Sequence, residues 1–209
     1  MGLDKDCWAL LAEINGPQAL VDGYGPEIAD LLQKHGPVSL KSTADPVERL
    51  KLWKARKVGG GLVGQISPDV MIQDAVIPRH KLAEVLNDIY AESERANIPV
   101  INLFHAGDGN LHPNFMFDGR DPAQAAAVKE LGARLMAKVV SVGGTLSGEH
   151  GIGNDKMDYL PLLFTPLEMA AHEAVALTFN PDSQLNPGKV LPRRRFRRQP
   201  AEKGGHAPV

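Results

Sequence analysis

The segment between residues 98 and 117 constrains the fold of this chain more than any other part of the sequence. Two apolar runs, "IPVINLF" at 98–104 and "LHPNFMF" at 111–117, lie on either side of an Asp-Gly dipeptide at 108–109. Apolar runs that flank Asp-Gly are the strongest short-range signal for a β-hairpin. We therefore expect an antiparallel sheet in which these two runs are neighbouring strands.

Helical patterns come before and after this hairpin. Apolar residues in 79–97 follow the 3,4 spacing of an amphipathic helix, and Asp-Pro pairs mark the start of two other helices. The predicted helices cover 26–36, 45–57, 79–97, 121–144 and 166–179, and the other predicted strands cover 7–14, 37–43 and 69–78. This order predicts an α+β fold, with a ferredoxin-like, largely antiparallel sheet and helices packed on one face.

Composition argues against several classes of protein. The net charge is −2 and only 5% of the residues are aromatic, which speaks against a nucleic-acid partner. No apolar run approaches the roughly 20 residues of a membrane span, and the first residues lack the pattern of a signal peptide. The lone Cys7 fits a reducing compartment. We expect a cytoplasmic protein, and peripheral attachment to a membrane within a complex stays open.

The polar turn "HAGDGNLH" at 105–112 is the first candidate for a functional site. If its Asp-Gly pair forms a two-residue turn, His105 lies directly opposite His112, and Asn114 follows on the same face. Two imidazoles so placed can share one divalent metal ion at about 2.0–2.1 Å. The alternative is a polar turn whose histidines are hydrated or satisfied within the core.

A second segment, "SGEHGIG" at 147–153, adds a carboxylate and another histidine. Two histidines and a carboxylate make a three-ligand set that leaves metal positions open to a substrate. In an extended segment Glu149 and His150 would point in opposite directions, so one could bind the metal while the other acts as a base. The alternative is a glycine-rich turn with a Glu-His pair on the surface.

Three separated stretches give the chain a family resemblance. "HAGDGNLHPNFMFD", "VGGTLSGEHGIG" and "FNPDSQLNPGKVLP" resemble the C-terminal cap, or substrate, domain of FAD-linked 2-hydroxy-acid oxidases and dehydrogenases. That family includes glycolate oxidase flavoprotein subunits, D-lactate dehydrogenases and D-2-hydroxyglutarate dehydrogenases. "WKARK" and "ISPDVMIQDAVIPR" also look like the family, closest to glycolate oxidase, and the resemblance covers about residues 7–192.

The resemblance implies a role for each candidate residue. His105, His112 and Glu149 would bind a divalent metal such as zinc. His150 would be the base that takes the α-hydroxyl proton while hydride passes to FAD. The other implied contacts are Arg56 with the substrate carboxylate, Asn114 with substrate or metal, and Asn186 and Lys189 with the flavin. The alternative for Arg56 is a solvated helix residue.

The resemblance also implies a domain organisation. Residues 1–192 would form the C-terminal domain, truncated at its N-terminus. The arginine-rich residues 193–209 lie outside the resemblance, and their loss of hydrophobic periodicity predicts a basic, disordered tail. FAD would be bound by a separate N-terminal domain or subunit, which nothing in this sequence resembles. We therefore expect the chain alone to be inactive toward glycolate or D-lactate. Ile72 and Gln73, where some relatives have a basic side chain, argue against a dicarboxylate substrate.

Two other interpretations stay open. A stand-alone divalent-metal-binding module or small metallohydrolase would need only His105, His112, Glu149 and water. A non-catalytic subunit would instead pair with a separate flavoprotein chain. Sheet edges left without a neighbour would favour association, including homo-oligomers.

Overall fold

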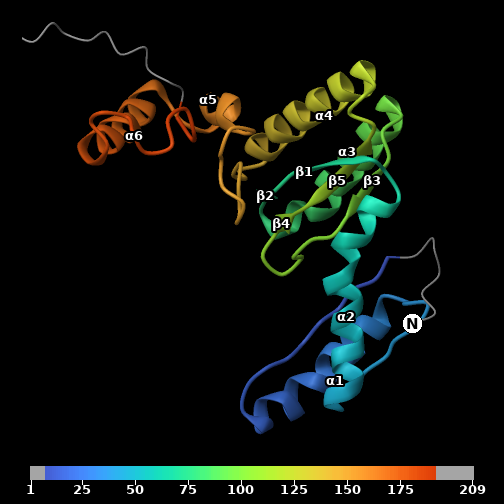
Figure 1. The fold of residues 1–209 in the computed structure, drawn as a ribbon. Helices are drawn as coiled ribbons and strands as arrows, with labels where there is room; N and C mark the ends of the chain where they lie inside the picture. The colour runs from blue at the N-terminus through green and yellow to red at the C-terminus, as the bar shows by residue number, and fades with distance from the viewer. Residues whose placement is uncertain (1–7, 192–209) are drawn as a thin grey trace, which may run out of the picture. The chain divides into compact units, whose positions relative to one another are not determined.

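The chain divides into two compact units, Met1–Leu62 and Val63–Val209, and a computed structural model describes residues 8–191 (Figure 1). Cys7 and the predicted tail at 193–209 lie outside the described residues. None of the described helices is long and apolar enough to cross a membrane.

The first unit contains two helices, α1 (Gln18–Lys34) and α2 (Pro46–Leu62). Pro26, the predicted start of the first helix, lies inside α1. The prediction missed the preceding turns because the glycines beside this proline lower helix propensity. Asp45 begins α2 as predicted, since its Oδ1 accepts the N–H groups of the second and third helical residues at 2.8 and 2.9 Å.

Two strands predicted for the first unit are wrong. Residues 8–14 and 37–43 form no strand. A β-strand is held by hydrogen bonds to a neighbouring strand, and neither segment has such a neighbour among residues 8–191. Most of their side chains are exposed, Val38 to 96%. An apolar run predicts a strand only if a partner strand exists, and the run itself does not reveal one.

The second unit is built on two antiparallel sheets, which confirms the antiparallel arrangement predicted from the hairpin. The three-stranded sheet has the order β1 (Asp69–Ile72), β5 (Pro113–Phe117), β3 (Val100–Asn102). The two-stranded sheet pairs β2 (Ala75–Val76) with β4 (Asn110–Leu111). The single strand predicted over 69–78 is therefore two strands that belong to different sheets.

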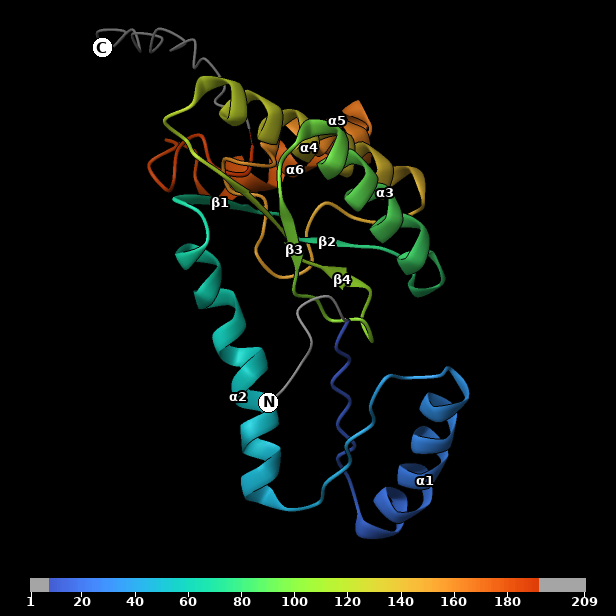
Figure 2. The same cartoon turned by 90° about the vertical axis from the view of Figure 1, so that its right-hand side faces the viewer.

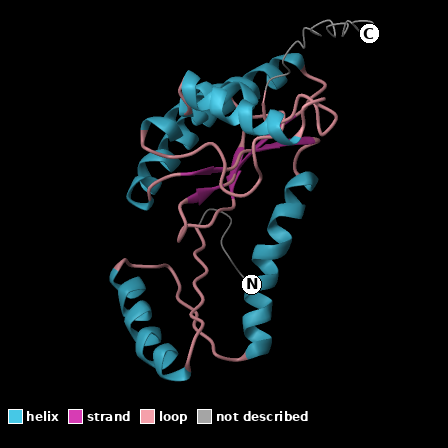
Figure 3. Ribbon diagram, turned by 90° about the vertical axis from the view of Figure 1, so that its left-hand side faces the viewer, coloured by secondary structure: helices cyan, strands magenta, loops and turns pink. Residues whose placement is uncertain are grey.

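Two long helices cover one face of the three-stranded sheet, as Figures 2 and 3 show. α3 (Leu82–Ala96) follows a short 3-10 helix, η2 (Arg79–Lys81), and α4 (Pro122–Ser141) follows β5. Asp121 caps α4 as predicted, because its side chain accepts the N–H of Ala123 at 2.9 Å. Helices on one face of an antiparallel sheet are the arrangement predicted from the sequence.

Shorter elements complete the second unit. They are η1 (Val63–Gln65), η3 (Met157–Tyr159), α5 (Leu160–Leu163) and α6 (Pro166–Phe179). α6 has the predicted bounds, and Thr165 begins it with a capping box. The sequence does not predict η3 and α5, because elements of three or four residues are too short to show helical periodicity.

The hairpin register differs from the predicted one by two residues. β3 and β5 pair Ile101 with Asn114, and an isolated bridge pairs His105 with Asn110. The predicted pairing of His105 with His112 is therefore wrong, because the connecting loop is longer than a two-residue turn. A shift of two residues leaves side chains on the same face, since they alternate with period two. His105 and His112 thus stay on one face.

Gly109 accounts for the longer loop. Its φ is +72°, and a Cβ added there would lie 2.2 Å from the carbonyl oxygen of Ile77. The N–H of Ile77 donates to the carbonyl oxygen of Gly109 at 3.0 Å. The turn is therefore set by close packing against the chain that follows β2, which a local turn rule does not include.

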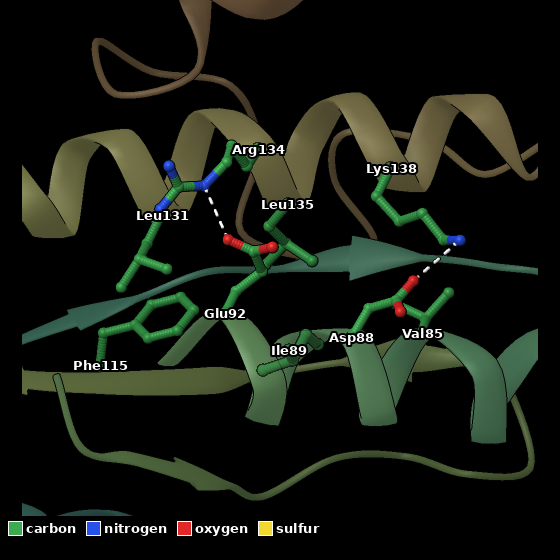
Figure 4. Close-up of a pocket in the computed structure, with 9 residues that line it drawn as sticks. All are labelled: Val85, Asp88, Ile89, Glu92, Phe115, Leu131, Arg134, Leu135 and Lys138. Carbon is green, nitrogen blue, oxygen red and sulfur yellow. Dashed lines mark ion pairs between the residues drawn. The ribbon is translucent and has the colours of Figure 1, made fainter. Parts of the chain in front are cut away.

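The apolar core of the second unit lies between the sheet and the helix pair. In Figure 4, Phe115 of β5, Ile89 of α3 and Leu131 of α4 line a cavity of about 240 Å³. At the helix surfaces, Arg134 pairs with Glu92 at 2.9 Å. A lysine further along α4, Lys138, pairs with Asp88 at 2.8 Å. Such solvent-exposed pairs contribute little to stability, so apolar burial holds α3 and α4 on the sheet.

We expect Phe115→Ala to lower the free energy of unfolding by about 3–5 kcal/mol, because Phe115 is only 1% exposed and the substitution leaves a cavity. Phe179→Ala is the matched control in the same unit, since Phe179 is 79% exposed, and its effect should stay within about 0.5 kcal/mol. Urea denaturation followed by circular dichroism measures both. Equal losses in the two variants would contradict this assignment of the core.

Candidate functional site

Three side chains that are distant in the sequence meet in the second unit. Oε1 of Glu149 lies 2.9 Å from Nε2 of His112 and 3.8 Å from Nε2 of His105. One nitrogen or oxygen atom from each of the three residues lies within 4.8 Å of the other two. The structure thus brings together the three residues that were predicted as metal ligands.

His150 lies against the same group. Its ring stacks on that of His112 with centroids 5.0 Å apart, and its Nε2 lies 4.0 Å from Oε1 of Glu149. Glu149 and His150 do not point in opposite directions, as they would in an extended segment, because the chain bends at 148–150. Both neighbours therefore face one cluster, which we call the His-Glu cluster: His105, His112, Glu149 and His150.

The His-Glu cluster has a buried side and an open side. The side chain of His112 is 9% exposed, whereas those of His105, Glu149 and His150 are 47%, 53% and 46% exposed. His112 therefore forms the floor of the cluster. The other three side chains form a rim that solvent, and hence a small molecule or ion, can reach.

A buried carboxylate behind the cluster holds the loop of Glu149 and His150. Oδ2 of Asp74 accepts the hydroxyl hydrogen bond of Ser147 at 2.6 Å. The same oxygen accepts the backbone N–H groups of Gly148, Glu149 and His150 at 2.9, 3.0 and 2.9 Å. Asp74 is fully buried. Three successive N–H groups directed at one oxygen account for the bend in the loop.

Sequence reasoning missed Asp74, although a signal was present. The polar pair Gln73-Asp74 interrupts the apolar run "VMIQDAVIP", and both residues are buried. Gln73 is turned toward α4, where its amide nitrogen would lie 3.0 Å from a Cβ added to Gly132. The side chain of Asp74, its neighbour in the chain, instead binds the loop that carries Glu149 and His150. A buried polar pair inside a strand pattern indicates partners elsewhere in the chain.

Lys156, which follows the loop in the sequence, binds backbone oxygens at Asp74 and just before the loop. It is 4% exposed, and its ammonium group donates to the carbonyl oxygens of Asp74 and of Leu146, the latter at 2.8 Å. The same nitrogen lies 3.7 Å from Oδ2 of Asp74. Burial lowers the pKa of Lys156, and the Asp74 carboxylate opposes that shift. The two buried charges therefore compensate each other.

Burial and hydrogen bonding set the charges of the site. Burial alone would raise the pKa of Asp74, but the hydrogen bonds from Ser147 and the loop N–H groups outweigh it and hold this pKa well below its usual range. Burial lowers the pKa of His112, and the opposing Asp74 carboxylate does not reverse the shift. Asp74 is therefore ionised at neutral pH, and His112 is neutral, the form that can bind a metal.

Two asparagines support the cluster from the sheet. Nδ2 of Asn114 donates to the carbonyl oxygens of His112 at 2.7 Å and Ile101 at 3.1 Å. Asn110 packs against Gly148, where an added Cβ would lie 2.7 Å from its amide atoms. Asn114 thus lies beside His112, and a glycine is needed at 148 for the loop to approach the sheet.

Three other predicted contacts involve residues that are not members of the cluster. Arg56 belongs to α2, in the first unit. Asn186 and Lys189 are exposed in the segment after α6. The N–H of Val190 in that segment donates to the carbonyl oxygen of Gly153 at 2.8 Å, which ties the segment to the chain that follows His150. The roles predicted for Arg56, Asn186 and Lys189 stay predictions.

The residues present fit a divalent cation. Two imidazoles and a carboxylate are a donor set that zinc accepts, and each offers one atom to the same small volume. Nδ1 of His112 and Oδ1 of Asp74 face each other at 3.8 Å, and both are buried without a hydrogen-bond partner among the described residues. A carboxylate next to the distal nitrogen of a ligating histidine is the usual companion of a metal site.

Comparison with known proteins identifies relatives of the chain. Residues 2–190 match the family model described as FAD linked oxidases, C-terminal domain. The chain is 40% identical over 183 residues to the glycolate oxidase subunit GlcD of Escherichia coli K12, covering 88% of this chain and 37% of that protein. It is 34% identical over 187 residues to a D-lactate dehydrogenase of Anaerostipes hadrus, covering 82% of this chain and 38% of that protein.

The fold has a counterpart among solved structures. A 4-ethylphenol oxidase from Gulosibacter chungangensis superposes with a TM-score of 0.61 at 16% identity, over 86% of this chain and 38% of that one. This likeness supports the mixed helix and antiparallel-sheet fold. The chain thus spans less than two fifths of each of these three proteins.

We expect the imidazole of His112 to titrate below its ordinary pKa of about 6.5 in the metal-free protein, because burial disfavours the charged ring. NMR titration measures this, and His112→Asn identifies the signal by its loss. Since unfolding restores the ordinary pKa, the unfolding free energy should fall as pH drops from about 6.5 through the lowered value. A His112 signal that titrates above about 6.5 would contradict the prediction.

Proposed function

We propose that this chain, which belongs to the family of FAD linked oxidases through their C-terminal domain, forms the substrate side of an active site that oxidises a small 2-hydroxy acid to the 2-oxo acid. The proposed substrates are glycolate and D-lactate, because the relatives include a glycolate oxidase subunit and a D-lactate dehydrogenase. The observation that carries the proposal is the His-Glu cluster, in which a candidate base adjoins a candidate metal site at an open rim.

Oxidation of a 2-hydroxy acid removes one proton from the hydroxyl oxygen and one hydride from C2. His150 is suited to take the proton at Nε2, since this atom faces the cluster and its side chain is 46% exposed. The proton passes to the imidazole, and the single bond between C2 and the hydroxyl oxygen becomes a double bond as the hydride leaves C2. FAD, when bound, supplies the acceptor for that hydride.

A divalent cation would be held by His105, His112 and Glu149, with Asn114 beside them. Its positive charge would favour the deprotonated hydroxyl oxygen over the protonated one. Arg56 is proposed to bind the substrate carboxylate, because a guanidinium group matches a carboxylate with two parallel hydrogen bonds. The side chains of Ile72, which is 52% exposed, and Gln73, which is buried, carry no charge. Neither therefore offers a positive charge to a second carboxylate.

FAD is proposed to come from a part of the protein beyond this chain or from a separate subunit. The chain spans 37% of the glycolate oxidase subunit, which leaves ample length in that relative for another domain. Residues 1–192 would be the substrate domain, with 193–209 as a basic tail. Asn186 and Lys189 are exposed and would contact the flavin. We place this reaction in the cytoplasm, with a homo-oligomer as one form of the assembly.

We expect His150→Asn to slow reduction of the flavin by glycolate or D-lactate about 100-fold or more, because the hydroxyl proton loses its acceptor. The measurement is anaerobic stopped-flow bleaching of FAD, with the chain joined to the flavin domain of its own protein. His172→Asn is the control, since His172 makes an edge-to-face contact with Phe164 outside the cluster. Equal rates for the two variants would refute the role of His150. The chain alone with added FAD should show no bleaching.

We also expect the chain to bind one equivalent of Zn²⁺, and His112→Ala to abolish this binding, because it removes the buried ligand of the three. Equilibrium dialysis with metal analysis measures both, and His172→Ala should bind like the unaltered chain. A folded protein that retains no metal would contradict the metal site. Ester hydrolysis by the zinc-loaded chain, lost in His112→Ala, would instead support a metallohydrolase.

A further inference from the structure

We propose that Asp74 is a positioning residue whose two carboxylate oxygens fix His112 and the Glu149–His150 loop relative to each other. The inference rests on the metal site proposed above. Oδ2 binds the loop and Oδ1 faces the imidazole of His112, so one side chain contacts both halves of the His-Glu cluster. Asp74 is not one of the three residues proposed to bind the metal.

Oδ2 sets the path of the loop. It accepts the N–H groups of Gly148, Glu149 and His150, all between 2.9 and 3.0 Å. Hydrogen bonds to an ionised acceptor are stronger than those between neutral groups. The backbone of Glu149 and His150 is therefore held at the base of their side chains, and this directs one carboxylate and one imidazole toward His112.

Oδ1 favours one position for the proton of the neutral His112 ring. Nδ1 of His112 lies 3.8 Å away, and neither atom has another hydrogen-bond partner among the described residues. A movement of about 1 Å brings them to hydrogen-bond distance. A carboxylate only accepts hydrogen bonds, so Asp74 favours the tautomer with the proton on Nδ1. In the metal-free chain Oε1 of Glu149, which lies 2.9 Å from Nε2, competes for the same proton. Asp74 therefore raises the share of molecules in which Nε2 keeps the free lone pair that a metal requires.

Lys156 keeps this carboxylate in place. Its ammonium group donates to the backbone oxygen of Asp74, at the strand break, and to that of Leu146, just before the loop. Lys156 follows the loop in the sequence, so both ends of the loop are fixed at residue 74. The ammonium also lies 3.7 Å from Oδ2 and compensates the buried negative charge.

A merely structural role predicts something different. An anchor that only stabilised the loop would affect stability, and the molecules that remain folded would keep the same ratio of the two His112 tautomers. A positioning role requires that Asp74→Asn move the ring proton of His112. The amide oxygen can still accept the loop N–H groups, while its NH2 group would donate to Nδ1 and force the proton onto Nε2.

The first test reads the tautomer of His112 by NMR in the metal-free full chain, with ¹⁵N-labelled histidine at a pH where imidazoles are neutral. We expect the unaltered chain to hold a share of molecules with the proton on Nδ1, and Asp74→Asn to hold the proton on Nε2. Asp69→Asn is the matched control on β1, because Asp69 accepts one backbone N–H, from Gly119 at 2.8 Å, outside the cluster. The same ratio of the two tautomers in Asp74→Asn and in the unaltered chain would overturn the proposal.

The second test titrates Co²⁺ into the same proteins and follows its visible absorption. We expect Asp74→Asn to bind Co²⁺ about 10–100-fold more weakly with an altered spectrum, and Asp69→Asn to match the unaltered chain. Equal affinities and tautomers in Asp74→Asn and the unaltered chain would refute positioning by Asp74. If the unaltered chain binds no Co²⁺, the metal site fails, and the tautomer still decides the role of Asp74.

Ser147→Ala serves if Asp74→Asn does not fold. It removes one of the hydrogen bonds to Oδ2, at 2.6 Å, and the hydroxyl oxygen that accepts the N–H of Gly151 at 2.7 Å, and it leaves the carboxylate in place. Amide hydrogen exchange at 148–150 should become about tenfold faster, while exchange in α4 stays unchanged. Exchange at these three amides of the unaltered chain as fast as in an unfolded peptide would show that Oδ2 does not hold the loop, which would overturn the proposal.

Discussion

The buried carboxylate of Asp74 is the interaction on which the arrangement of the site depends. A buried charge is strongly unfavourable unless hydrogen bonds and an opposite charge compensate it. Here the donors are Ser147 and three successive backbone N–H groups, and the opposite charge is Lys156. These donors reach one oxygen only if the loop bends. The burial of Asp74 and the bend that directs Glu149 and His150 inward therefore require each other.

One face of the three-stranded sheet carries the apolar core, and the other face carries polar groups of the site. Phe115 points into the core beneath α3 and α4, whereas its neighbour Asn114 lies beside His112. Because strand side chains alternate, one short strand supplies both an apolar anchor and a support for the site. The helices that cover one face leave the other free to carry polar groups. The site is thus built on a rigid element, while its rim remains open.

Local rules predicted which side chains share a face of the sheet more reliably than they predicted the pairing between strands. The predicted opposition of His105 and His112 is wrong, yet the two rings lie 5.5 Å apart, because a register shift of two residues preserves the face. The strand predicted over 69–78 breaks at Gln73 and Asp74, since β1 and β2 join different sheets. Residues 8–14 have strand-like composition but no partner strand among the described residues.

The sequence alone determined the hairpin, the capped helices α2, α4 and α6, and the residue types that form the His-Glu cluster. These features depend on neighbours a few residues apart, where spacing and turn chemistry decide the structure. The tertiary structure alone revealed Asp74 and Lys156. Asp74 meets Ser147 across 73 positions and Lys156 across 82. No local pattern encodes such contacts, because they exist only once packing brings the strand break, the loop and the buried lysine together.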